Sequence, residues 1–229
     1  MSCCFDQAFT YLYDRFWPQT NIDIPDGLED LLNIDKLFID ERLDGIDVFT
    51  RKYCQAHCVI VNMTGQPLYS IYQESHGKKQ DRSFRSSSVN SKLKIHDKNG
   101  KEVLMLEKPD FLNHNEVYVY SGRLKLGIIK KHDYYSQLTK LSVFNSRRRR
   151  VFEININPSN NIKQYEINST KGQHHKIGEI NKKFSDSNGE YCINPDKYGI
   201  YFFSIEFDVK EKALLLAALL LLDSNYFEC

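Results

Sequence analysis

The sequence has no apolar stretch long enough to cross a membrane as a helix. Its longest uninterrupted apolar run covers ten residues, 213–222, whereas a transmembrane helix needs about 20. Charged residues just upstream and Asp223 just downstream prevent an extension, because each Asp, Lys or Arg near the bilayer centre costs about 2.5–3.5 kcal/mol. The sequence therefore predicts a buried core helix at this place.

An excess of charge of one sign is also absent. The 229 residues hold 31 Lys and Arg against 30 Asp and Glu, a formal net charge of +1. This balance argues against a nucleic-acid-binding protein that relies on its overall charge, although a local basic patch stays compatible with it. The composition is 41% hydrophobic, as in an ordinary globular chain, and the length allows a sizeable core.

Cysteine is scarce and scattered, with six residues in the whole chain. No charged-then-apolar signal peptide opens the sequence. We therefore expect free thiols and a reducing, intracellular compartment.

The motifs of covalent and metal-assisted catalysis are missing as well. The sequence contains no Gly-rich phosphate loop, no G-x-S-x-G elbow and no H-E-x-x-H pair. Cys54 and Cys58 lack a second pair at zinc-finger spacing. His174 and His175 are adjacent, and neighbouring strand residues point to opposite faces. We therefore predict that the protein is not an enzyme.

Short apolar stretches separated by turns fill most of the chain. Each stretch is bounded by Gly, Asn, Asp or Ser, which is typical of serial β-hairpins. The predicted strands are residues 37–39, 46–49, 58–61, 68–72, 93–96, 103–106, 117–120, 126–129, 141–144, 151–154, 165–167, 176–180 and 200–207. Turn residues at 24–27 also predict a short helix over 28–34 with Asp26 as its cap.

The single strongly apolar helix decides the architecture. A helix that is apolar on every face must be surrounded by lipid or protein, and about a dozen strands can close around it as a barrel without free edges. We predict a mainly β fold, with a leader over residues 1–26 and a barrel domain over 27–229. The C-terminal helix, residues 208–223, is expected to begin near Asp208 and to bury Leu214, Leu215, Leu216, Leu219, Leu220 and Leu222.

Four consecutive arginines, Arg147, Arg148, Arg149 and Arg150, are the sharpest charge feature. They fall at a predicted hairpin tip. One interpretation is attachment to anionic lipid headgroups, worth about 1 kcal/mol per basic residue near the surface. A second is nuclear import or nucleic-acid binding, and a third is a solvated turn. Lys78–79, Lys130–131 and Lys182–183 extend the patch if they share its face.

The order and spacing of several segments resemble the phospholipid scramblase family. The resemblance covers about residues 27–228. Its motifs are Gly27-Leu28-Glu29 with Ile34-Asp35-Lys36-Leu37-Phe38-Ile39, Tyr53 with Val61-Asn62-Met63-Thr64-Gly65-Gln66-Pro67-Leu68-Tyr69, Asp97-Lys98-Asn99-Gly100-Lys101-Glu102-Val103 with Leu106-Glu107-Lys108-Pro109, and Tyr198-Gly199-Ile200 followed by Phe207-Asp208-Val209-Lys210.

This resemblance implies a tubby-like closed antiparallel β-barrel of about twelve strands around a C-terminal hydrophobic helix. It also implies calcium-stimulated, ATP-independent, bidirectional movement of phospholipids between leaflets. The expected location is the cytoplasmic face of a membrane, the plasma membrane first, with a nuclear pool as a further option. Expected partners are the phospholipid membrane and further proteins. Two alternatives stay open: a membrane-peripheral lipid-binding or adaptor module without translocation, and a nuclear or nucleic-acid-binding regulator.

The sequence departs from the family pattern at two places. The central cysteine run that carries palmitate in the family has no counterpart at residues 110–115, so Cys3 and Cys4 are either the acylated pair or two unmodified thiols. The family's calcium loop corresponds to residues 194–206, where Asn194, Asp196 and Glu206 offer side-chain oxygen. Calcium takes six to eight oxygen ligands, so we favour a turn followed by the last strand for this segment, with a degenerate, weak site if calcium binds.

Overall fold

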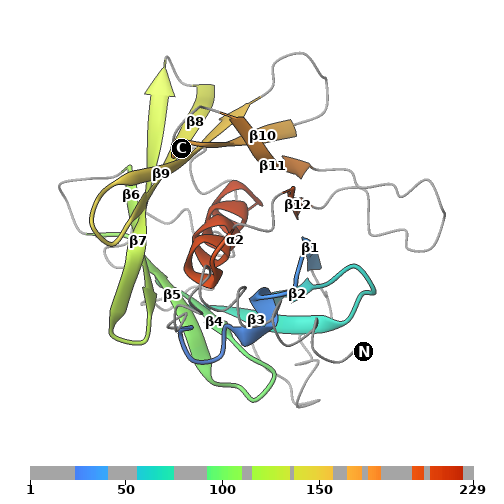
Figure 1. Ribbon diagram of the computed structural model, residues 1–229. Coiled ribbons are helices and arrows are strands. Elements are labelled where there is room, and N and C mark those ends of the chain that lie inside the picture. Colours follow the sequence, from blue (N-terminus) through green and yellow to red (C-terminus); the bar gives the residue numbers. More distant parts are fainter. Residues whose placement is uncertain are drawn as a thin grey trace, which may run out of the picture.

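A computed structural model gives the fold of the chain. It describes residues 24–40, 56–74, 92–109, 115–134, 137–156, 164–171, 175–181, 198–203 and 207–223. Within these residues the structure is mainly β, with one α-helix near the C-terminal end (Figure 1). The predicted strand over residues 46–49 lies outside the described residues.

The described residues form twelve strands, which follow the alternation of apolar and polar side chains in the sequence. The strands are β1 (Lys36–Asp40), β2 (Ala56–Val61), β3 (Pro67–Glu74), β4 (Lys92–His96), β5 (Glu102–Glu107), β6 (Glu116–Ser121), β7 (Leu124–Tyr134), β8 (Gln137–Asn145), β9 (Arg150–Ile156), β10 (Gln164–Ser169), β11 (His175–Asn181) and β12 (Gly199–Phe202).

The strands close into an antiparallel barrel in which each pairs with its neighbours in sequence, and β1 pairs with β12. The closing pair sets Leu37 opposite Ile200. On the other edge of β1, Ile39 lies opposite Ile60. All four of these side chains are buried in the main core. The predicted closed barrel of about twelve strands is thereby confirmed.

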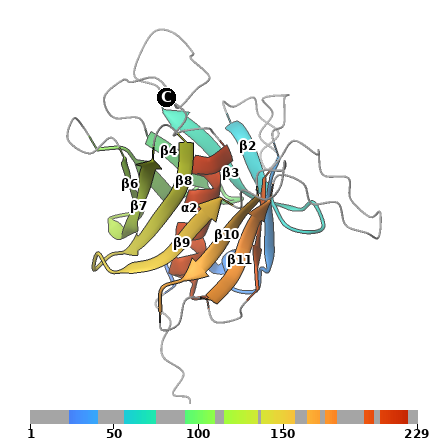
Figure 2. The same cartoon turned by 90° about the horizontal axis from the view of Figure 1, so that it is seen from above.

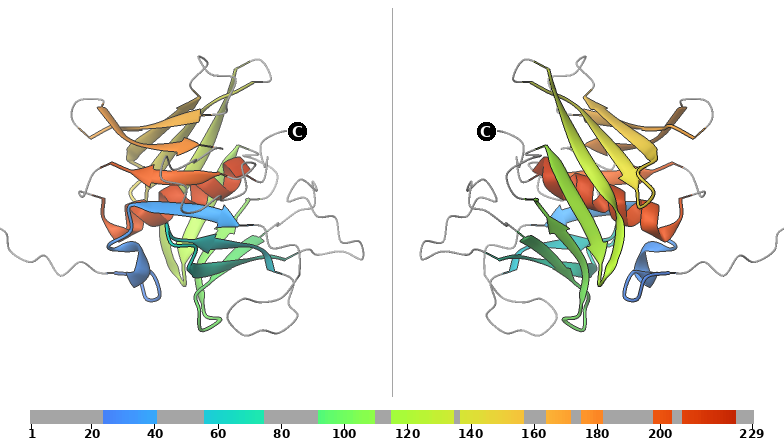
Figure 3. Two further views of the ribbon diagram at one scale, coloured as in Figure 1. Left: turned by 90° about the vertical axis from the view of Figure 1, so that its right-hand side faces the viewer. Right: turned by 90° about the vertical axis from the view of Figure 1, so that its left-hand side faces the viewer.

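The helix α2 (Val209–Asp223) fills the barrel. It runs along the inside of the wall in Figure 2, and both views of Figure 3 show strands on either side of it. Asp208 caps its first turn, because its Oδ1 accepts a hydrogen bond from the amide of Glu211 at 2.7 Å. The buried side chains of α2 include the six predicted leucines, Leu214, Leu215, Leu216, Leu219, Leu220 and Leu222.

A close contact holds the helix against the wall. A Cβ on Gly127 of β7 would lie 2.1 Å from the carbonyl oxygen of Phe144 and 2.9 Å from Cδ2 of Leu214. The missing side chain therefore lets the strand approach α2. In the described part of the chain, no helix has both the length and the apolar character that crossing a bilayer requires.

Two predicted elements are shorter than expected. The strand predicted over 200–207 ends at Phe202. The helix predicted over 28–34 is a single 3-10 turn, η1 (Glu29–Leu31), without a side-chain cap. Asp26 forms an ion pair with Lys101 instead. The Nζ of Lys212 donates to the carbonyl oxygens of Leu32 and Ile34 at 2.9 and 2.8 Å, where the chain leaves η1 for β1.

The antiparallel order places one set of connections at one end of the barrel. The turns β2–β3, β4–β5, β6–β7, β8–β9 and β10–β11 lie there, together with the start of β1 and the first turn of α2. We call this the helix-start end; it is the lower end in Figure 2.

Candidate functional site

The four arginines lie in and beside the β8–β9 turn at the helix-start end. Asn145 organises this turn. Its amide donates to the carbonyl of Arg149 at 2.9 Å, and its own carbonyl accepts from the amide of Arg148 at 2.9 Å. Its Oδ1 accepts from the amides of Arg147 and Arg149 at 3.1 and 3.0 Å. The polar backbone groups of this turn therefore form hydrogen bonds within the turn, and the side chains of Arg147, Arg148 and Arg149 are available for other contacts. We call Arg147, Arg148 and Arg149 the arginine turn.

The same turn occurs twice more in the part of the chain that the structure describes. Asn62 and Asp97 play the part of Asn145 in the β2–β3 and β4–β5 turns, with the same backbone bonds and side-chain bonds. In both of them the fourth residue is a glycine with positive φ, Gly65 at 74° and Gly100 at 77°. The corresponding residue here is Arg148, at φ 57°.

A left-handed backbone costs a non-glycine residue about 1–2 kcal/mol. Glycine avoids this cost and is the usual residue at such a position. Arg148 carries it although two equivalent turns of the same chain carry glycine. Strained residues of this kind gather at functional sites. This comparison favours a function for the guanidinium of Arg148.

The four arginines differ in whether they form an ion pair with a described residue. Arg150 forms an ion pair with Glu153 at 2.5 Å, and Glu153 also pairs with Lys140 at 2.6 Å. Among the residues that the structure describes, none forms an ion pair with the three members of the arginine turn, and all three are exposed. The uncompensated charge is therefore concentrated in three consecutive residues.

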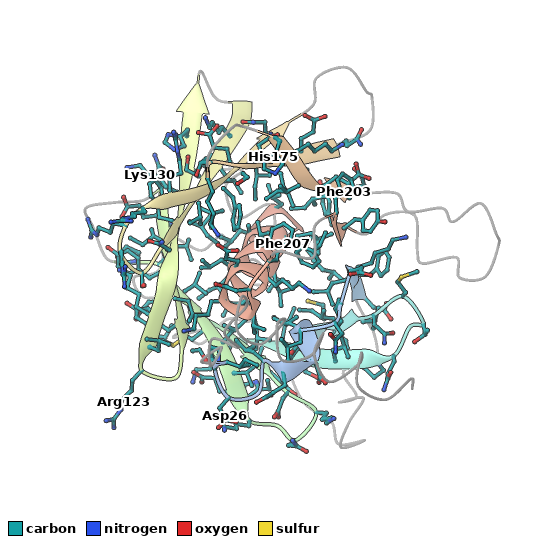
Figure 4. All side chains as sticks on the ribbon, viewed as in Figure 1. Asp26, Arg123, Lys130, His175, Phe203 and Phe207 are labelled. Atoms are coloured by element: carbon teal, nitrogen blue, oxygen red, sulfur yellow. The ribbon has the colours of Figure 1, made fainter. Side chains whose placement is uncertain are left out.

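The adjacent β6–β7 turn adds positive charge. Arg123 is exposed at its tip and projects away from the barrel (Figure 4). Lys125 places its Nζ 3.8 Å from the ring centroid of Tyr118, a cation–π contact. Burial, and then the charge of Arg148, lowers the pKa of Lys125. The two turns therefore lie close enough for their charges to interact.

Of the lysines expected to extend this patch, the structure describes those of β7 only. Lys130 lies farther along β7 and pairs with Glu116 at 3.3 Å. His132 contacts Ser142 through Nε2 at 3.0 Å. Burial and the charges of Lys130, Lys140 and Arg150 lower the pKa of His132, so neutral imidazole is favoured there. Lys78, Lys79, Lys182 and Lys183 lie outside the described residues.

The residues expected to hold calcium or a lipid anchor also lie outside the described part. These are Asn194, Asp196 and Glu206 for calcium, and Cys3 and Cys4 for acylation. The described segments contain no group of three His, Cys, Asp or Glu that could hold a metal ion. The expected donors comprise only two carboxylates and one amide, fewer than the six to eight oxygens that calcium takes.

The histidine and cysteine candidates stay apart in the described segments. Cys58 is half-buried and packs against the core. His175 is exposed at the start of β11. Cys54 and His174 lie outside the described residues.

The structure reveals a buried polar group at the start of α2 that the sequence reading did not single out. Glu211 forms an ion pair with Lys171 of the β10–β11 turn. Lys212 binds the η1 carbonyls and places its Nζ 5.5 Å from the ring centroid of Phe202. Burial raises the pKa of Glu211 and lowers that of Lys212. The only sequence signal for this group is a Lys-Glu-Lys triplet directly before an apolar run.

The chain is similar to known proteins. A family model described as Scramblase matches residues 17–229. Phospholipid scramblase 1 of Rattus norvegicus is 26% identical over 226 residues, which cover 92% of this chain and 65% of that protein. Phospholipid scramblase 1 of Homo sapiens is 27% identical, with 92% and 69% covered. Phospholipid scramblase 2 of Bos taurus is 26% identical, with 92% and 74% covered.

The chain thus spans about two thirds of the length of the rat relative. Among solved structures, an X-ray structure of an Arabidopsis thaliana protein is similar with a TM-score of 0.48 and 15% identity, and the match covers 84% of this chain and 92% of that one.

Proposed function

The chain belongs to the scramblase family, and on this premise we propose that it acts on phospholipid membranes and moves phospholipids between leaflets. Movement in both directions without ATP needs no covalent chemistry. The barrier is the transfer of a polar headgroup through hydrocarbon, which a protein lowers by offering polar groups along the path. The proposal therefore assigns no catalytic residue.

The arginine turn is the observation that supports a membrane as the site of action. Its three guanidiniums are exposed and have no ion pair among the described residues. Each basic residue near an anionic surface contributes about 1 kcal/mol, and guanidinium binds phosphate oxygens in a bidentate manner. The strained backbone of Arg148 is consistent with a turn whose function depends on its positive charge.

Vesicle sedimentation tests the attachment. We expect the full chain to bind vesicles that contain phosphatidylserine, and the triple variant R147Q/R148Q/R149Q to bind far less. The matched control is K92Q/K94Q/K98Q, which removes the same charge from β4 and its turn. Equal loss in the two variants would mean that only net charge matters, and would contradict the proposed role of the turn.

Transbilayer movement is measured in the same vesicles with a headgroup-labelled phospholipid and a reductant that does not cross the membrane. A rise in accessible label with protein dose supports translocation. Calcium is titrated from zero in this assay, and N194A/D196A/E206Q tests the expected donors.

C3S/C4S tests whether acylation strengthens membrane attachment in cells. We expect the protein at the cytoplasmic face.

A second candidate is a membrane-peripheral lipid-binding module without translocation. The filled barrel favours it, because α2 occupies the interior and its side chains there are apolar and buried. Vesicle binding without a dose-dependent rise in accessible label would select this candidate. Both candidates predict that R147Q/R148Q/R149Q weakens vesicle binding. The amount of accessible headgroup label therefore distinguishes them.

A further inference from the structure

An exposed leucine lies beside the arginine turn. Leu124 is the first residue of β7, directly after the exposed Arg123, and its side chain is 46% exposed. Three positions along β7, Gly127 lies opposite Asn145, which organises the arginine turn. The β6–β7 and β8–β9 turns are therefore neighbouring tips on the same side of the helix-start end.

The next part of the same rim is acidic on balance, because its four carboxylates outnumber Lys98 and Lys101, the exposed cations of the β4–β5 turn. Asp26 pairs with Lys101 in the β4–β5 turn. Glu29, Asp30 and Asp97 lie close enough to the buried Tyr69 hydroxyl to raise its pKa further, after burial has raised it most. An anionic surface attracts the arginine turn and repels these carboxylates.

Met63 lies on the other side of this acidic segment. It is in the β2–β3 turn, at the same end of the barrel, and is 47% exposed. The β4–β5 turn separates it from Leu124 around the rim. Met63 and Leu124 are thus similarly exposed at one end of the barrel and differ in the charges beside them.

From this arrangement we infer that the lipid-facing surface is formed by Arg123, Leu124, Arg147, Arg148 and Arg149, with Leu124 inserted among the lipids below the headgroups. The barrel is then tilted on the membrane, so that its β6–β7 and β8–β9 turns contact the lipids and the acidic part of its rim lies away from the membrane surface. An exposed apolar residue that is flanked by basic residues is the usual chemistry of an interfacial anchor. The inference rests on the proposed attachment to phospholipid membranes and adds its orientation.

Tryptophan fluorescence tests the orientation. The chain has one tryptophan, Trp17, so W17F is the parent for L124W, M63W and N115W. Asn115 is exposed at the opposite end, between β5 and β6. With phosphatidylserine vesicles that carry bromine on their acyl chains, we expect L124W to shift to shorter wavelength and to be quenched. M63W and N115W are expected to stay unchanged.

Quenching of M63W or N115W in place of L124W, or of all three equally, would overturn the inference. A short-wavelength emission of L124W without vesicles would also overturn it, because the side chain at position 124 would then be covered by protein in the absence of lipid. If the parent sediments with vesicles and L124W is not quenched, only the orientation is wrong. If the parent does not sediment at all, the proposed function and the inference fail together.

A second measurement needs no tryptophan. L124S is expected to weaken sedimentation with phosphatidylserine vesicles several-fold, and M63S is expected to leave it unchanged. Both side chains are exposed at turns, so neither change removes a core contact. Equal binding of L124S and the unchanged chain would overturn the role of Leu124 as an anchor.

Discussion

The ammonium of Lys212 lies 2.9 Å from the carbonyl oxygen of Leu32, although 180 residues separate the two in the sequence. The same ammonium reaches the carbonyl of Ile34 at 2.8 Å. One buried cation thus joins the first described segment to the first turn of α2. It also satisfies two carbonyls at a place where η1 stops after a single turn.

Replacement of this cation tests how much the junction contributes. In K212M the two carbonyls lose a charged donor, and a hydrogen bond to a charged group contributes about 1.5–3 kcal/mol of net stability. We expect a clear fall in the free energy of unfolding, measured by chemical denaturation. K98M, at an exposed position of the β4–β5 turn, is the control, and equal stability of the two variants would refute the expectation.

Arg148 is expected to oppose stability and support binding at the same time. In R148G the left-handed backbone at φ 57° becomes free of strain, so the free energy of unfolding should rise by up to about 1 kcal/mol. Binding to phosphatidylserine vesicles should weaken, since one guanidinium is lost. R148A separates the two effects, because it removes the charge and keeps the strain. A fall in stability for R148G would show that the side chain supports the fold.

Two neighbouring arginines should contribute unequally to vesicle binding. Arg149 has no ion pair in the described part of the chain, whereas Arg150 pairs with Glu153. We expect R149Q to cost about 1 kcal/mol, or roughly five-fold in the dissociation constant for phosphatidylserine vesicles. R150Q is expected to cost less in binding. Sedimentation at several salt concentrations measures both, and an equal or larger effect of R150Q would argue against the arginine turn as the contact.

Glu211 should make stability depend on pH. Burial raises its pKa above 4.5, and the Lys171 ammonium offsets this only in part. An acid with a raised pKa binds its proton more tightly in the folded protein than in the unfolded chain, so stability falls as pH rises from 4.5 through the folded-state pKa.

The matching variant is E211Q, which removes this titration. We expect the unfolding free energy of E211Q minus that of the unchanged chain to grow from pH 4.5 upward and then to level off. Chemical denaturation across this pH series measures it. A difference that does not vary with pH would show that Glu211 titrates alike in the folded and unfolded states.

The barrel could be predicted from the sequence because its signals are local. Alternating strands and turn residues such as Asn62 and Gly65 specify hairpins, and the apolar run at 213–222 specifies a helix that must be surrounded. The end of β12 was less predictable. Apolar side chains continue through Phe207, which packs near the start of α2 with its ring centroid 5.4 Å from that of Phe202.

The candidate site could be predicted only in part. Four arginines in a row are visible in the sequence, and Arg150 meets Glu153 only three residues later, but the second partner of Glu153, Lys140, is brought to it only when β8 and β9 pair. The strain at Arg148 also depends on the turn that Asn145 organises. The role of Leu124 requires the β6–β7 turn to lie beside the β8–β9 turn. These features arise from register and topology, and no short stretch of sequence contains them.

The closure of β1 on β12 has a consequence for biosynthesis. Leu37 finds its partner Ile200 only after nearly the whole chain has left the ribosome, and α2 follows later still. Hairpins can form during synthesis, but their apolar faces have no core until the last described residues emerge. Long-range closure of this kind makes folding slow and leaves strand edges exposed in the meantime. The nascent chain is therefore expected to depend on chaperones until α2 has been translated.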